Sequence, residues 1–166
     1  MLVVKRRNLE KYMCALVGVL YAYMFTLIPN SYFKDRVNYV EYARNYDSFI
    51  DLIDNKSFFA SEVLFLYVNK VLDLIFSPES TVYFLVFLIN FVLFIAFLQY
   101  SRNYSLAFLG LLAFFLLPFG FSYQLGSIRQ SIAISIFLVA VLYIKKINIL
   151  LVAISVVLGF MHTSFF

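Results

Sequence analysis

Two ionisable side chains, Arg129 and His162, lie within or at the edge of apolar stretches, where a charge is costly and commonly functional. Ser127 and Gln130 are three residues apart and fit a capping box, which predicts Arg129 in the first turn of a helix. A helix N-terminus attracts anions, and a guanidinium can hold a phosphate through two hydrogen bonds. Arg129 therefore indicates a phosphate or carboxylate site. The alternative is an arginine that extends to the headgroups or pairs with an acid in a loop.

His162 belongs to a small, polar helix face that it shares with Ser155 and Gly159, at spacings of four and three residues. Such faces usually pack against another helix, so we expect His162 to point into a bundle near the level of Arg129. Its ordinary pKa suits a general acid or base. Taken alone, the pattern favours the other interpretation, an interhelical hydrogen bond without a catalytic role.

A carboxylate and a guanidinium, Asp35 and Arg36, are adjacent just beyond the first apolar stretch, and Tyr39 and Tyr42 follow them. This pair could bind or activate a hydroxyl group, or it could be a solvated pair in a loop. Tyrosines near a polar cleft could stack on sugars, although aromatic residues are also common in membrane helices and at their interfaces.

The composition decides which class of fold must position these groups. Hydrophobic residues make up 64% of the 166 residues and charged residues 13%, and the mean hydropathy is +0.92. A soluble domain is about half apolar and about a quarter charged, so soluble, disordered and fibrous classes are excluded. The net charge of +4 does not indicate nucleic acid, because the basic residues lie at the ends of apolar runs. The single cysteine, Cys14, excludes an internal disulfide and a cysteine zinc site.

Five apolar stretches are long enough to cross a membrane, given a minimum of about 17 residues. They are residues 12–28, 82–98, 105–121, 128–144 and 147–165. The basic residues before the first stretch predict a cytoplasmic N-terminus, and five crossings then place Arg102 and Lys145 in the cytoplasm as well. The same topology places the candidate residues together on the outer side: Asp35, Arg36, Glu62, Arg129 and His162.

Two further stretches, residues 37–53 and 61–76, show helical periodicity with a polar face. In the first, Val37, Val40 and Ala43 form the apolar face of an amphipathic helix, and in the second Ser61 could cap a helix that begins with Glu62. A sixth crossing at 61–76 would break the positive-inside pattern, so we predict interfacial helices in an outer loop, residues 30–81. The predicted fold is an all-α polytopic transmembrane bundle with five spans and two interfacial helices, as one membrane domain over residues 1–166.

Four short motifs, in this order, resemble the EpsG family of Wzy-type O-antigen and exopolysaccharide polymerases. They are KDRVNY at residues 34–39, SEVLF at 61–65 with Val68-Asn69, IRQSIA at 128–133, and HTS at 162–164. The resemblance covers nearly the whole chain. Family members continue past this histidine with further spans, and the sequence stops abruptly at Phe166. We therefore expect a truncated product, inactive on its own, that represents the N-terminal part of a larger domain.

The resemblance implies a multi-pass protein of the bacterial inner membrane that joins undecaprenyl-diphosphate-linked repeat units on its outer side. The implied catalytic residues are Arg129, which would stabilise the diphosphate, and His162 or Asp35, which would act as the base. The candidate substrate-binding residues are Arg36, Tyr39, Glu62 and Gln130. We expect no metal and no other cofactor. The expected partners are the lipid-linked oligosaccharide, membrane lipid, and a chain-length regulator and flippase of the same pathway.

Two other functions remain open at this stage. The first is a flippase for lipid-linked oligosaccharides or another polysaccharide exporter, which would share the hydrophobicity and the intramembrane cation. A flippase needs polar residues through a central cavity, however, and residues 82–98 and 105–121 are almost wholly apolar. The second is a membrane scaffold without a catalytic site.

Overall fold

The computed structural model describes residues 2–45, 63–101, 103–144 and 148–159, with side chains described from Tyr12 onward except Val63. This part of the chain is helical and contains no strand. The helices are α1 (Leu2–Thr26), the 3₁₀ helix η1 (Asn30–Tyr32), α2 (Lys34–Arg44), α4 (Val63–Asp73), α5 (Pro78–Tyr100), α6 (Tyr104–Leu116), α7 (Pro118–Leu125), α8 (Ile128–Tyr143) and α9 (Ile149–Gly159). The predicted all-α class is thus confirmed for the described residues.

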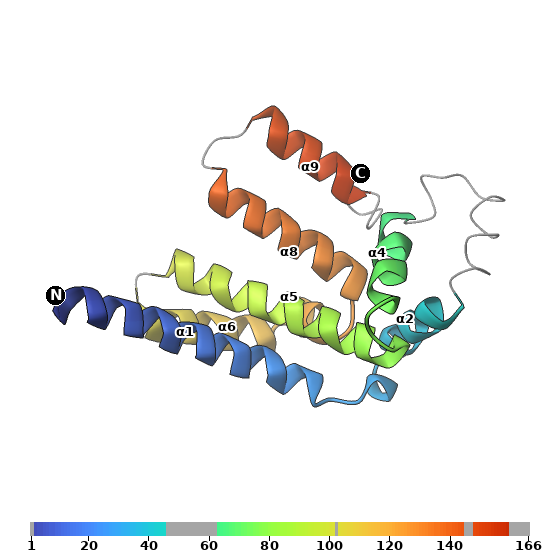
Figure 1. Cartoon of the computed structure of the whole chain (residues 1–166), viewed down its shortest axis with the longest axis horizontal. Coiled ribbons are helices and arrows are strands. Elements are labelled where there is room, and N and C mark those ends of the chain that lie inside the picture. Colours follow the sequence, from blue (N-terminus) through green and yellow to red (C-terminus); the bar gives the residue numbers. More distant parts are fainter. Residues whose placement is uncertain (1, 46–62, 102, 145–147, 160–166) are drawn as a thin grey trace.

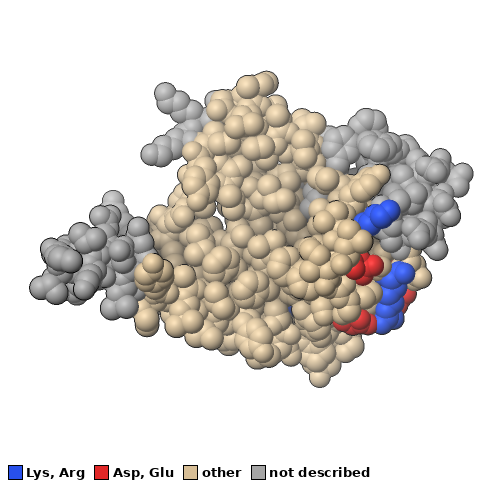
Figure 2. Space-filling model, in the orientation of Figure 1, with Lys and Arg blue, Asp and Glu red and all other residues tan. Residues whose placement is uncertain are grey.

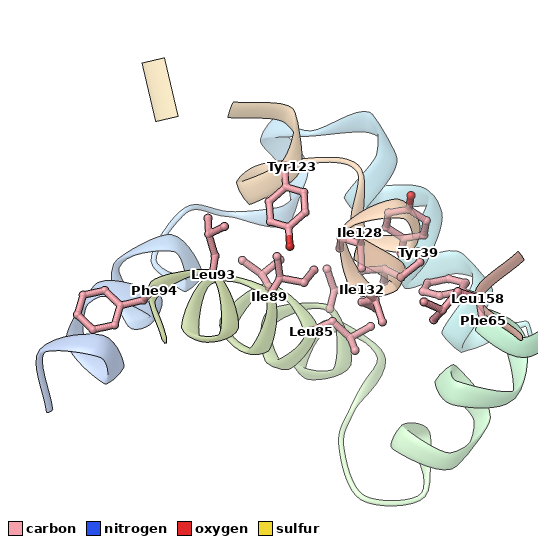
Figure 3. Close-up of a cluster of buried hydrophobic side chains, with 14 of the residues drawn as sticks. Tyr39, Phe65, Leu85, Ile89, Leu93, Phe94, Tyr123, Ile128, Ile132 and Leu158 are labelled. Carbon is pink, nitrogen blue, oxygen red and sulfur yellow. The ribbon is translucent and has the colours of Figure 1, made fainter. Parts of the chain in front are cut away.

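Helix α5 lies at the centre of the bundle and packs against α1, α6, α8 and α2, while α9 packs on the outer side of α8 (Figure 1). Its inward face carries Leu85, Ile89 and Leu93, each no more than 3% exposed. Figure 3 shows these side chains meeting Ile132 of α8 and Tyr123 of α7. Because lipid tails are as apolar as leucine, this core stabilises the bundle through close van der Waals packing.

Among the described helices, only α5 is by itself long and apolar enough to cross a membrane. It begins where Ser77 accepts a hydrogen bond from the Ser80 N–H and Pro78 takes the first helical position. The shorter apolar helices are Tyr12–Thr26, Ile128–Tyr143 and Ile149–Gly159. Together with α5, these three helices lie where four of the five stretches were predicted. The five crossings themselves stay a prediction.

The fifth stretch, residues 105–121, is divided between two helices, and whether the pair forms one broken crossing stays a prediction. Helices α6 and α7 meet at an angle of 94°. Pro118 has no N–H to donate and disfavours helical backbone at the residue before it, so Leu117 is extended (φ −77°, ψ 140°). The bend brings the backbone of Gly120 so close to Phe114 that a Cβ atom would lie 1.7 Å from the Phe114 carbonyl oxygen.

The two helices predicted in the outer loop are present in part, and their place at a membrane interface stays a prediction. In α2, Val40 and Ala43 of the predicted apolar face are buried and Val37 is 42% exposed, and the buried face also includes Arg36 and Tyr39. Arg36 can be buried because it finds backbone carbonyl partners inside the bundle. The remainder of the first helix, residues 46–53, lies outside the described part of the chain.

Helix α4 crosses the direction of α5 and covers one end of the bundle (Figure 1). It buries Phe65, Leu66 and Asn69 and exposes Tyr67 and Val71. Lys70 and Asp73 are exposed as well, so the outer face of α4 carries both apolar and charged side chains, as a helix at an interface can. The predicted cap, Ser61, is not among the described residues.

Charged side chains gather at one end of the bundle. All nine charged residues whose side chains are described belong to α2, α4 or the first turns of α5 and α8. On the face drawn in Figure 2 they cluster over α2 and α4, while the rest of the described surface carries none. This arrangement confirms that Asp35, Arg36 and Arg129 share one end of the bundle; it does not show which side of a membrane that end faces.

Candidate functional site

The start of α8 places Arg129 in the first helical turn, as the sequence predicts. The predicted capping box does not form at the start of α8, because Ser127 makes no side-chain cap hydrogen bond. Its hydroxyl pairs with the Ser122 hydroxyl at 2.8 Å. The turn is held instead by Ser131, whose hydroxyl donates to the carbonyls of Tyr123 (2.8 Å) and Ser127 (2.7 Å). The N–H groups at the start of α8 are therefore not occupied by a Ser127 cap.

Arg129 packs against two tyrosines of α2. Its guanidinium carbon lies 5.6 Å from the centre of the Tyr39 ring and 5.9 Å from that of Tyr42. Tyr39 is only 4% exposed, and burial raises the pKa of its phenol, an effect that hydrogen bonding to Arg129 opposes. Contacts of this kind with a desolvated cation are worth about 2 kcal/mol. The two tyrosines therefore fix the position of Arg129 relative to α2.

Arg36 is fully buried next to the turn between α7 and α8. Its Nε donates to the carbonyl of Leu125, its Nη1 donates to the carbonyl of Ile28 at 3.1 Å, and its guanidinium lies 4.8 Å above the Phe33 ring. Nη2 is also buried and has no hydrogen-bond partner among the residues that the structure describes. Burial lowers the pKa of Arg36 to about 10, so the side chain keeps its charge at neutral pH. Arg36 is not part of a solvated loop pair with Asp35.

The structure thereby brings two separate sequence candidates together. Arg36 of α2 binds the carbonyl of Leu125 at the end of α7, and Arg129 at the start of α8 lies over Tyr39 and Tyr42 of α2, so both arginines lie where α2 meets the α7–α8 turn. Asp35 is exposed at the start of α2, close enough to oppose ionisation of Tyr39. Gln130 is half-buried in the first turn of α8. Two cations beside a helix N-terminus are suited to an anionic group with more than one charge.

Glu62 and His162, the remaining predicted site residues, lie outside the described residues. Within the described part of the chain, no three His, Cys, Asp or Glu side chains come together as ligands for a metal ion. The expectation of a reaction without metal stays a prediction.

A buried polar cluster beneath the two arginines was missed by the sequence analysis. Asn90 of α5, fully buried, donates to the Gln124 carbonyl at 3.0 Å, and the Gln124 side chain accepts from the Tyr21 hydroxyl at 2.8 Å. The cluster joins α5, α7 and α1 and supports the end of α7 that carries Leu125. The available signal was Asn90 itself, a polar residue in the middle of a predicted span.

Comparison with known proteins identifies one family. The family model described as "EpsG family" matches residues 11–166, from the first predicted span to the last residue. No curated protein sequence and no solved structure gives a significant match.

Proposed function

The chain belongs to the EpsG family, whose members are Wzy-type polymerase-like membrane proteins, and we propose that it polymerises glycan repeat units. In this proposal the growing chain, linked to undecaprenyl diphosphate, is transferred to a sugar hydroxyl of the next lipid-linked unit. The reaction takes place on the outer side of the bacterial inner membrane, with the N-terminus of the protein in the cytoplasm. Family membership supports a polysaccharide polymerase-like function, and the site geometry supports the transfer chemistry.

The chemistry of the transfer assigns a task to each group. The bond between the anomeric carbon of the donor sugar and the diphosphate oxygen breaks, and its electrons remain on the diphosphate. The acceptor oxygen forms the new glycosidic bond, and its proton passes to a base, His162 or Asp35. Arg129 faces the developing negative charge of the leaving diphosphate and stabilises it.

The observation that carries the proposal is the convergence of Arg36 and Arg129 on the turn between α7 and α8. A diphosphate leaving group gains negative charge as the bond breaks, and the buried charge of Arg36 behind the turn adds to the stabilisation that Arg129 provides. Tyr39 is too buried to stack broadly on a sugar, so its contribution is to orient Arg129. Gln130 and Glu62 remain proposed substrate contacts, and Arg36 contributes to binding through its charge.

A polymer-length assay in cells tests this proposal. A strain without the gene receives the complete natural gene, as wild type or with Arg129→Ala, Arg129→Lys or the control Arg44→Ala, and its surface glycan is resolved by size on a gel. Arg44 is an exposed residue of α2, ion-paired with Glu41 and Glu79 away from the α7–α8 turn. Loss of one preorganised donor typically costs about 10²–10³ in kcat. We therefore expect single repeat units for Arg129→Ala, short chains for Arg129→Lys, and the full ladder for Arg44→Ala. A full ladder from Arg129→Ala would overturn the role in diphosphate stabilisation.

The same cells distinguish polymerisation from transport of the repeat unit. Loss of a polymerase leaves single units at the cell surface, whereas loss of a flippase leaves them inside. The groove between α1 and α6 and that between α4, α5 and α8 are lined almost entirely by apolar side chains. This lining supports the polymerase over an exporter, which would need a polar path for the sugars.

A further inference from the structure

An open apolar groove runs between α1 and α6. It holds about 510 Å³, within the range of roughly 300–1,000 Å³ typical of small-molecule sites. Its lining includes Tyr21, Phe25 and Ile28 on the α1 side and Phe108, Leu112 and Phe115 on the α6 side. Several lining residues are exposed, Leu112 at 55%, so the groove opens on the surface that would face lipid.

A continuous series of aromatic contacts leads from this groove to the buried arginine. The ring of Phe25 lies 5.9 Å from Phe115, Phe115 lies 5.6 Å from Phe121, and Phe121 lies 6.2 Å from Phe33. The Arg36 guanidinium lies over Phe33 at 4.8 Å. The groove and the candidate site around Arg36 and Arg129 are thus joined by continuous packing.

The buried guanidinium of Arg36 lies behind the end of the groove that is nearest the candidate site. Ile28 lines the groove, and its carbonyl accepts the hydrogen bond from Nη1 of Arg36. Nη2 of the same side chain is buried and has no hydrogen-bond partner among the described residues. A buried donor without a partner is costly, and an anion or its bound water would relieve that cost. The groove is therefore lined by apolar side chains, and the buried charge of Arg36 lies directly behind Ile28 at one end of it.

We propose that this groove binds the isoprenoid tail of the lipid-linked donor, with the diphosphate toward Arg36 and Arg129. The inference rests on the proposed function, because it assigns the tail of the same substrate. An amphiphile with an anionic head matches both the charge at the groove end and the apolar lining. A tail held in a fixed groove also fixes the depth of the head, which reduces the entropy that the transfer step must overcome.

Photo-crosslinking tests the location directly. The full chain is placed in nanodiscs of phosphatidylglycerol and phosphatidylethanolamine with undecaprenyl diphosphate that carries a diazirine in its tail. We expect labelled peptides from residues 21–28 and 108–115, and we expect unlabelled undecaprenyl diphosphate to suppress this labelling. A phosphatidylglycerol probe with a diazirine in its acyl chain should show no such suppression.

A matched pair of variants on α6 sharpens the test. Leu112→Trp fills the groove, whereas Leu106→Trp places the same side chain at a residue that does not line it; the two leucines are 55% and 53% exposed. We expect Leu112→Trp to lower groove labelling and polymer length several-fold, and Leu106→Trp to change neither. If Leu112→Trp does not accumulate in the membrane, Met24→Trp blocks the same groove from the α1 side.

The outcomes separate this inference from the function on which it rests. Equal labelling by the phospholipid probe, or labelling confined to the groove between α4, α5 and α8, would overturn the tail assignment. If Arg129→Ala still abolished polymer in that case, the proposed function would stand without this groove. If the groove were labelled as expected while Arg129→Ala kept the full ladder, the tail site would stand and the diphosphate role would fail.

Discussion

Replacement of Arg36 by methionine provides a direct test of how the site is held together. The change removes two hydrogen bonds to the carbonyls of Leu125 and Ile28 and keeps an apolar side chain of similar length in a fully buried position. Each carbonyl left without a partner costs about 1–3 kcal/mol, partly offset because a charge is no longer buried. We expect a net loss of about 3 kcal/mol of unfolding free energy, which corresponds to a lower unfolding midpoint of about 6–12 °C.

The chain carries its own probe for this measurement. Cys14 is the only cysteine, lies partly buried on α1, and contributes to a pocket that Phe94 of α5 also lines. A thiol-reactive fluorophore therefore reports the separation of α1 from the bundle as detergent-solubilised protein is heated. Arg36→Lys should fall between wild type and Arg36→Met, because one ammonium group cannot reproduce the fork that spans two carbonyls. The control Arg44→Met should leave the midpoint unchanged. If Arg36→Met unfolded at the same midpoint as wild type, the two hydrogen bonds of Arg36 to the carbonyls of Leu125 and Ile28 would make no net contribution to stability.

Three further changes test other parts of the structure with the same thiol assay. Gly120→Ala should prevent the bend between α6 and α7 and abolish folding, because its Cβ would lie 1.7 Å from a backbone oxygen; Gly126→Ala, with 3.5 Å of clearance, should be tolerated. Asn90→Leu should lower the midpoint by about 2–4 °C, since an interhelical hydrogen bond in a membrane contributes about 1 kcal/mol, whereas the exposed Leu88→Ala should not. Burial raises the pKa of the Tyr39 phenol, so folding favours its neutral form. The contribution of Tyr39 to stability is therefore constant below pH 10 and is lost as the pH rises above 10. Tyr39→Phe should accordingly lose less stability than wild type when the pH is raised above 10.

Hydrophobic runs and charges predicted the positions of the long helices, because both depend on local composition. The run at residues 82–98 lies within α5, and the run at 128–144 coincides with α8 to within one residue. The bend at Pro118 was missed because the apolar run continues through it, although proline carries a clear local signal. The predicted capping box is absent because the Ser127 hydroxyl pairs with the Ser122 hydroxyl instead, and Ser122 becomes available only once α7 has formed.

The sequence predicted some residues of the candidate site, but it did not predict how they are arranged in space. Arg129 is in the first helical turn, as expected, but nothing in the local sequence shows that Tyr39 and Tyr42, about ninety residues earlier, form its surroundings. Periodicity assigned Val37 to the apolar face of the helix and could not show that Arg36 is buried, because a buried guanidinium depends on carbonyl groups supplied by other parts of the chain. Asn90 illustrates the same limit, since its partner lies at the end of α7.

The hydrogen bond between Arg36 and Leu125 spans 89 positions of the chain. Ribosomes add about 5–20 residues per second, so Arg36 emerges several seconds before its carbonyl partner exists. During that interval a permanently charged group must wait among water and lipid headgroups, while α1 and α5 can already associate. The order of synthesis thus means that the arginine end of the bundle closes after α1 and α5 can associate, and a ribosome that stalls before residue 125 leaves a membrane-inserted intermediate whose guanidinium is still hydrated.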